Sequence, residues 1–296
     1  MKPTPLKKGD LIAIAAPAGP FDRARFFRGV NLLKKSKFKV AFRKDIFNQH
    51  RRLPYLAGED LRRARELNAC LSDPKSKALL FARGGFGCQR VLPLLENRCL
   101  PKIVVGSSDL TVLLNHLWTR HRLPSLYGPM VAPHLVVPKN VSRLTRALTD
   151  PDFFKKQKLI AKSVLKPGRA SGRLVGGCLS LVISTLGTPW EIDTKESLLF
   201  LEDTNEEPYA VDRMLTQLEQ AGKLKTVRGI VFGTFRHDKT LFPSKVETVL
   251  RERFKTFRGP ILWGLRFGHC PDPLLIPFGG IGQIKGNQLL IIKGIF

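Results

Sequence analysis

Residues 78–87 of this 296-residue chain read Ala-Leu-Leu-Phe-Ala-Arg-Gly-Gly-Phe-Gly, an apolar run followed at once by a glycine-rich turn. A short run without polar residues predicts a strand that is covered on both faces. The same pattern occurs at Leu11–Ala16 and at Ile103–Val105, and stretches with helical periodicity separate the three runs. Strands that alternate with helices predict an α/β fold built on a doubly wound parallel sheet.

The pattern divides the chain into two predicted domains. Residues 1–135 carry the alternating strands and helices of the doubly wound domain. Residues 136–170 are weakly periodic and rich in Lys, Pro and Ser, so we expect the crossing between the domains there. Residues 171–296 predict a smaller, β-rich α/β domain, because short apolar runs alternate with Gly/Pro turns from Gly268 to Phe296.

The charge of the chain is strongly positive. Lys and Arg total 50 against 24 Asp and Glu, a net charge of +26. Such an excess indicates a polyanionic partner: nucleic acid, an anionic membrane surface or an acidic substrate. The basic residues are spread along the chain, however, without the clustered aromatics or motifs of a nucleic-acid reader. We therefore do not expect nucleic acid as the partner, and a basic, anionic-polymer-binding protein without turnover stays as an alternative from another class.

The five cysteines are odd in number and widely spaced, and no CxxC pairs them. This spacing predicts reduced thiols, with neither a disulfide framework nor a metal site, and no cofactor motif is present. No apolar stretch approaches the ~18 residues that cross a membrane. The run Leu11–Ala16 is also shorter than a signal-peptide core. We expect a cytoplasmic protein that needs no cofactor and no membrane.

Two strand-to-helix turns could carry chemistry, because ligands of parallel sheets bind at the carboxyl ends of the strands. The turn Arg83–Gly87 could cradle an anion or an oxyanion, or be only a tight turn. The turn Val105–Leu110 contains two serines. It is read either as a helix cap or as a nucleophile elbow, although Leu110 breaks the GxSxG pattern of hydrolases.

A nucleophilic serine needs a base and an orienting carboxylate. Of six histidines, His269 lies in a loop bounded by Gly and Pro, the kind of segment that often carries catalytic residues. Glu202 and Asp203 follow directly on the apolar run Leu198–Leu201 and so lie at the end of a predicted strand. The alternative for this acidic cluster is the start of the helix at Pro208, where acids favour the first turn.

A set of short motifs together resembles the LD-carboxypeptidase family, the serine peptidases of the murein tetrapeptide carboxypeptidase and microcin self-immunity type. The motifs occur in family order from about residue 9 to 281 and so cover nearly the whole chain. They are Gly9-Asp10, Ala82–Gly87, Gly106-Ser-Ser-Asp109, Tyr127-Gly-Pro-Met130, Gly176-Gly-Cys-Leu179, Phe200-Leu-Glu-Asp203 and Glu207-Pro-Tyr.

The resemblance implies a role for five residues. Ser108, the serine immediately before the aspartate of the elbow, falls on the nucleophile of the family, Glu202 on the carboxylate and His269 on the base. The backbone N–H groups of Gly85 and Asp109 fall on the oxyanion hole. The implied reaction is hydrolysis of an L,D peptide bond through an acyl-enzyme.

The resemblance also implies a substrate and an assembly. The expected substrate is the murein tetrapeptide, which loses its terminal D-Ala during cell-wall recycling, and the alternative is a peptidyl-nucleotide antibiotic cleaved by a self-immunity enzyme. A homodimer is expected. The chain departs from the family pattern at Ser107, where an aromatic is usual, at Tyr127, often His, at Cys178, commonly Asn, and at Lys37, usually Gly.

Overall fold

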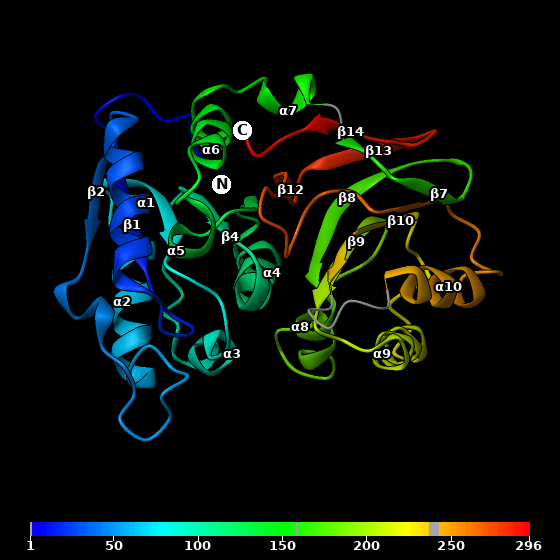
Figure 1. Ribbon diagram of the computed structural model, residues 1–296, viewed down its shortest axis with the longest axis horizontal. Helices are drawn as coiled ribbons and strands as arrows, with labels where there is room; N and C mark the ends of the chain where they lie inside the picture. The colour runs from blue at the N-terminus through cyan, green and yellow to red at the C-terminus, as the bar shows by residue number, and fades with distance from the viewer. Residues whose placement is uncertain (1, 158, 237–242) are drawn as a thin grey trace.

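The computed structural model describes residues 2–157, 159–236 and 243–296. The chain forms two halves that lie side by side, each built on one sheet (Figure 1). The two ends of the chain meet between the halves, where the Lys2 ammonium donates to the carbonyl oxygen of Phe296 at 3.1 Å.

The first sheet is the predicted doubly wound one. Its strands are β1 (Leu11–Ala15), β2 (Lys39–Phe42), β3 (Ser76–Phe81), β4 (Ile103–Gly106), β5 (Ser125–Tyr127) and β12 (Ile276–Phe278). They lie in the order β12-β5-β4-β3-β1-β2, with β1 to β5 parallel and β12 antiparallel to β5. The order β2-β1-β3-β4-β5 is one of the two common doubly wound orders, which confirms the predicted fold class.

Helices connect and cover the strands of this half. They are α1 (Arg23–Lys35), α2 (Asp60–Ser72), α3 (Cys88–Val91), α4 (Thr111–His121), α5 (Val131–His134) and α6 (Pro138–Thr149). The short helix α7 (Phe153–Lys156) follows α6 and packs against the second sheet. Asp22 caps the start of α1, because its carboxylate accepts the N–H of Arg25 at 2.7 Å. α3 ends at Val91 and a 3-10 turn follows, because Pro93 has no N–H to continue the helix.

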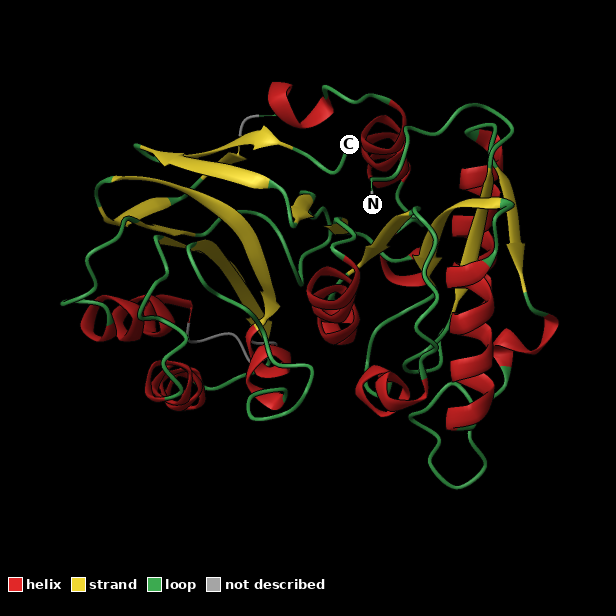
Figure 2. Cartoon of the chain, turned by 180° about the vertical axis from the view of Figure 1, so that it is seen from behind, coloured by secondary structure: helices red, strands yellow, loops and turns green. Residues whose placement is uncertain are grey.

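The second sheet is mixed. Its strands are β6 (Leu159–Ile160), β7 (Ser163–Lys166), β8 (Arg169–Cys178), β9 (Ser197–Thr204), β10 (Gly229–Arg236), β11 (Ile261–Trp263), β13 (Ile281–Lys285) and β14 (Gln288–Lys293). They lie in the order β6-β14-β13-β8-β9-β10-β11-β7, with β8 to β11 parallel. The connections between the parallel strands are α8 (Leu179–Ser184), α9 (Pro208–Gln220) and α10 (Pro243–Arg253). Seen from either side, these three helices gather along one face of the sheet (Figure 2).

The chain passes between the halves more than once. Residues 136–170, where we expect the crossing, form α6, α7, β6 and β7, and the two strands belong to the second sheet. Near its end the chain returns to the first sheet as β12 and then re-enters the second sheet as β13. The division at residues 135 and 171 stays a prediction.

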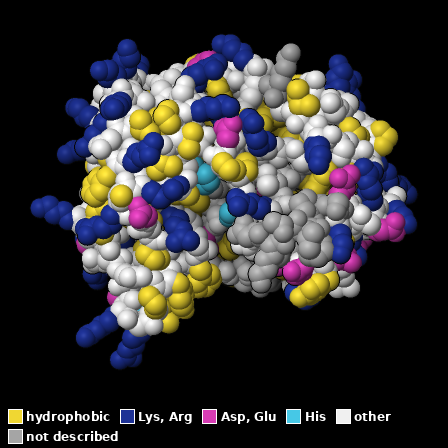
Figure 3. All heavy atoms as spheres, viewed as in Figure 1, with side chains coloured by type: hydrophobic (Ala, Val, Ile, Leu, Met, Phe, Trp, Pro, Cys, Tyr) yellow, Lys and Arg dark blue, Asp and Glu magenta, His cyan; other side chains and the backbone are white. Residues whose placement is uncertain are grey.

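The surface is basic over a wide area. Lys and Arg side chains are scattered across the whole face in Figure 3 rather than gathered in one patch. Among the residues that the structure describes, no helix combines the length and apolar character needed to cross a membrane.

Candidate active site

Ser108 lies immediately beyond β4, in the 3-10 turn Ser108–Leu110. Its φ is +59°, a left-handed conformation that is uncommon for a residue with a Cβ and typical of a nucleophile elbow. The Ser108 Oγ lies 3.1 Å from Nε2 of His269. Its neighbour Ser107 has an extended backbone and is buried. Of the two serines, Ser108 is the one that meets the histidine.

His269 lies in the loop after β11 and is held by the buried carboxylate of Glu202. The Oε2 atom of Glu202 lies 2.8 Å from the Nδ1 of His269 and also accepts the backbone N–H of His269 at 2.9 Å. The loop can approach this closely because residue 268 is glycine. Its φ is +90°, and a Cβ there would overlap the carboxylate of Glu202. The structure thus joins Ser108, His269 and Glu202 in one line of hydrogen bonds.

Several causes act on the pKa of His269 in opposite directions, and together they raise it above its ordinary value. Burial lowers the pKa, but the hydrogen bond that His269 donates to Glu202 and the negative charges of Glu202 and Asp203 together more than offset that effect. Glu202 is fully buried, so its charge acts on the imidazole with little screening by water. This arrangement can move the hydroxyl proton of Ser108 to Nε2 and stabilise the imidazolium that results.

Tyr127, at the end of β5, links Ser108 to the carboxylate of Glu202. Its hydroxyl donates to the Oε1 of Glu202 at 2.5 Å and accepts the backbone N–H of Ser108 at 3.1 Å. Burial, and then the nearby charge of Glu202, raise the pKa of Tyr127 well above its ordinary value, so the phenol keeps its proton. The local sequence around Tyr127 predicts no role for it at the site, although the residue stands in one of the motifs that carry the family resemblance.

The glycine-rich turn packs against the elbow. A Cβ on Gly84 would lie 2.9 Å from the Cβ of Ser108 and 3.4 Å from the backbone nitrogen of Asp109. Gly85 has a φ of +103°, and no described residue accepts a hydrogen bond from its N–H. The two amides predicted for the oxyanion hole, Gly85 and Asp109, therefore belong to segments in contact beside the serine. Their role stays a prediction.

The side chain of Asp109 fastens these two segments together. Its Oδ2 accepts the backbone N–H of Cys88, just after the glycine-rich turn, at 2.7 Å. Burial raises the pKa of Asp109 to about 7.

Asp203, next to Glu202, hydrogen-bonds to the backbone of α8 and not to His269. Its carboxylate accepts the N–H of Ser180 at 2.7 Å and so anchors the first turn of α8. Burial and the charge of Glu202 raise the pKa of Asp203 to about 6.

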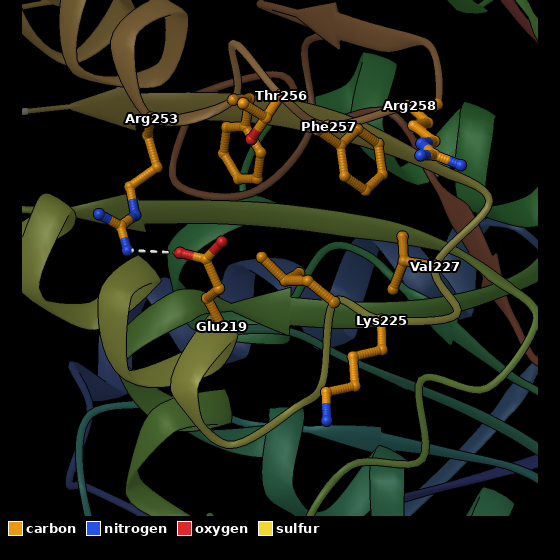
Figure 4. Close-up of a pocket in the computed structure, with 10 residues that line it drawn as sticks. Glu219, Lys225, Val227, Arg253, Thr256, Phe257 and Arg258 are labelled. Atoms are coloured by element: carbon orange, nitrogen blue, oxygen red, sulfur yellow. Dashed lines mark hydrogen bonds and ion pairs between the residues drawn. The ribbon is translucent and has the colours of Figure 1, made fainter.

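Two pockets differ in their relation to this chemistry. One, of about 350 Å³, adjoins the triad and is lined by Arg25, His134, Thr204, Arg236, His269 and Cys270, with two prolines. The other, of about 400 Å³, lies between the ends of α9 and α10, where Arg253 donates to Glu219 at 2.7 Å (Figure 4). The described lining of this second pocket holds no serine, cysteine or histidine. The pocket beside His269 is the candidate for substrate.

Comparison with known proteins identifies the family. The LD-carboxypeptidase N-terminal domain matches residues 12–128, and the LD-carboxypeptidase C-terminal domain matches residues 171–284. The chain belongs to the LD-carboxypeptidase family and is a serine-type carboxypeptidase, which confirms the resemblance seen in the motifs.

Individual relatives cover most of the chain. It is 37% identical over 292 residues to the probable murein peptide carboxypeptidase of Bacillus subtilis (strain 168), covering 94% of this chain and 89% of that protein. The crystal structure of muramoyltetrapeptide carboxypeptidase from Oxalobacter formigenes superposes with a TM-score of 0.81 at 28% identity, covering 94% and 97%. The microcin C7 self-immunity protein MccF of Escherichia coli is 25% identical over 313 residues, covering 93% and 90%.

Proposed function

We propose that this protein releases the terminal D-amino acid from a murein tetrapeptide by hydrolysing the L,D peptide bond. Ser108 is the nucleophile, His269 the general base and Glu202 the carboxylate that orients and charges the base. The observation that carries the proposal is the pair of distances through His269: 3.1 Å from Nε2 to the Ser108 Oγ and 2.8 Å from Nδ1 to Glu202. Both lie within the reach expected of a nucleophile and its base.

The first half of the reaction forms an ester. The Oγ of Ser108 attacks the carbonyl carbon of the scissile bond while its proton passes to Nε2 of His269. The N–H groups of Gly85 and Asp109 receive the oxyanion. The C–N bond then breaks as His269 gives its proton to the leaving nitrogen, and the D-amino acid departs with a free amino group.

The second half restores the enzyme. Water takes the place of the leaving group, His269 removes one of its protons, and the hydroxide attacks the ester carbon. The new tetrahedral intermediate collapses to the shortened peptide acid, and His269 returns its proton to Ser108. Glu202 accepts the hydrogen bond from Nδ1 of His269 in both halves of the reaction, which holds the tautomer and stabilises the imidazolium.

Relatives support the choice of a murein peptide. The Bacillus subtilis protein, at 37% identity, is named a probable murein peptide carboxypeptidase, and the Oxalobacter formigenes structure is a muramoyltetrapeptide carboxypeptidase. The more distant MccF, at 25% identity, supports the alternative of a peptidyl-nucleotide antibiotic as substrate.

Product analysis by mass spectrometry tests the proposal. The protein is incubated with murein tetrapeptide and, separately, with an aminoacyl sulfamoyl nucleoside as a mimic of the antibiotic. We expect free D-Ala and the tripeptide from the first reaction, at a rate well above that of the second. Cleavage of the nucleoside alone would favour self-immunity. No cleavage of either, with salt-sensitive retention on a polyanion, would favour the binding protein.

A further inference from the structure

The leaving group must lie next to His269. In the proposed reaction this histidine gives its proton to the departing nitrogen, so that nitrogen lies within hydrogen-bond reach of Nε2. The carboxylate of the departing D-amino acid is only two bonds further on. The pocket of about 350 Å³ that His269 lines is therefore the candidate to receive the terminal carboxylate.

Arg25 presents a fixed positive charge to this pocket. Its guanidinium donates through Nε to the carbonyl oxygen of Ala132 at 3.2 Å and through Nη2 to that of Pro133 at 3.1 Å. Both acceptors are backbone atoms of α5, and no carboxylate in the described parts of the chain pairs with Arg25. The guanidinium is thus held in place while its charge stays uncompensated, which is what a bound carboxylate requires.

His134 adds a neutral donor to the same pocket. Its Nδ1 accepts the backbone N–H of Met130 at 3.0 Å, so in the neutral ring the proton resides on Nε2. Burial, and then the positive charges of His269 and Arg25, lower the pKa of His134 to about 4, which keeps the ring neutral at ordinary pH. No described residue hydrogen-bonds to the Nε2 of His134. Figure 3 shows histidine side chains beside basic ones near the middle of the face.

We propose that Arg25 and His134 form the subsite for the α-carboxylate of the departing D-amino acid, and so make the enzyme a carboxypeptidase rather than an endopeptidase. This inference rests on the proposed function. The guanidinium supplies the charge, and the Nε2–H of His134 supplies a second donor. Pro133, Pro271 and Cys270 line the same pocket and leave apolar room for a small side chain such as that of D-Ala.

The test compares two substrates that differ only in the terminal group. One is the murein tetrapeptide ending in D-Ala, and the other ends in D-alaninamide, which has the same shape without the charge. For the wild-type enzyme we expect kcat/KM for the carboxylate to exceed that for the carboxamide by on the order of 30-fold, the worth of one hydrogen bond to a charged group. Arg25→Gln should reduce this ratio to about threefold or less.

Three further variants sharpen the result. Arg28→Gln changes an exposed arginine one turn away on α1 and should keep the wild-type ratio. His134→Asn keeps an acceptor for the N–H of Met130 but removes the Nε2–H donor, so the ratio should fall by about fivefold. Arg236→Gln changes another arginine of the pocket, and we expect it to reduce the ratio less than Arg25→Gln does.

The outcomes separate the two proposals. If the wild-type enzyme releases D-Ala but Arg25→Gln keeps the full preference for the carboxylate, the subsite is wrong while the proposed function stands. The same holds if Arg236→Gln, and not Arg25→Gln, abolishes the preference. If the wild-type enzyme cleaves neither substrate, the proposed function fails and the subsite with it.

Discussion

A glutamate lies in an ion pair at each end of β9, but the two pairs differ in their partners, their burial and their hydrogen bonds. Glu196, just before the strand, accepts from Nε of Arg228 at 2.7 Å, and both side chains are about half exposed (49% and 52%). Glu202, near the carboxyl end, is fully buried and accepts from Tyr127 and twice from His269. Water can replace the first pair, whereas the second leaves no polar atom of the carboxylate for water.

The difference follows from the way parallel strands are arranged. The carboxyl ends of β4, β5, β9 and β11 converge and bring Ser108, Tyr127, Glu202 and His269 together from both halves of the molecule. The amino end of β9 faces no such convergence. We therefore expect catalysis to depend on residues at the carboxyl end of β9 and not on Glu196 at its amino end. Each of the following substitutions tests this difference between the two ends.

Loss of the nucleophile should have the largest effect. Ser108→Ala is expected to lower kcat by about 10⁴-fold or more, because no other hydroxyl takes the place of a triad nucleophile. Ser107→Ala, one residue away but outside the line of hydrogen bonds, should cost less than about tenfold. Steady-state kinetics on the tetrapeptide, with circular dichroism to establish folding, makes the comparison. Equal losses in two folded variants would contradict the assignment.

Removing the negative charge of Glu202, at the carboxyl end of β9, should have the second-largest effect on activity. Glu202→Gln should lower kcat/KM by about 10³-fold or more, since a neutral amide can hold the wrong imidazole tautomer. The wild-type kcat/KM should rise with pH through a midpoint above 6.5, because Glu202 raises the pKa of His269. In Glu202→Gln the hydrogen bond to this side chain's carboxylate and its negative charge are lost, and burial, the largest cause, is opposed only by the charge of Asp203, so the midpoint should move to lower pH. A pH–rate profile measures both, and an unmoved midpoint would show that Glu202 does not control the base.

Removing the Tyr127 hydroxyl, which links the two halves of the molecule, should have an intermediate effect on activity. Tyr127→Phe removes the donor to Glu202 and the acceptor for the N–H of Ser108, so we expect kcat to fall by about 10- to 100-fold with little change in KM. Tyr209→Phe is the matched control, because Tyr209 on α9 is exposed. A rise in KM with kcat intact would mean that Tyr127 acts on binding instead of holding the triad.

A substitution at the amino end of β9 should have the smallest effect on activity and stability. Glu196→Gln should lower the free energy of unfolding by no more than about 1 kcal/mol, the usual range for an exposed ion pair. It should leave kcat/KM within about twofold of wild type. Urea denaturation and steady-state kinetics measure the two quantities, and a loss of activity comparable to that of Glu202→Gln would remove the asymmetry altogether.

Much of the fold and the triad could be predicted from the sequence because their signals are local. A short apolar run that ends at a Gly/Pro turn, such as Leu11–Ala16, predicts a buried strand, and a strand-to-helix turn with serines suggests a nucleophile. The choice of Ser108 over Ser107, however, came from family motifs rather than from local pattern. The structure accounts for it through the left-handed backbone of Ser108.

The remainder depends on contacts between distant segments. Tyr127 acts through Glu202, 75 residues away, and Arg25 is held by carbonyl groups more than 100 residues further on. Nothing in the pattern around Tyr127 or Arg25 signals these contacts. The strands β6 and β7 were missed because they are short and lie at the sides of a sheet whose centre comes from later residues.

The most direct test of the account is the site of the covalent intermediate. The enzyme is mixed with murein tetrapeptide, quenched in acid within milliseconds, and digested for peptide mapping by mass spectrometry. We expect an adduct of the tripeptide acyl group on Ser108, absent in Ser108→Ala. Turnover at the wild-type rate with an adduct on another residue, or with no dependence on Ser108, would contradict it.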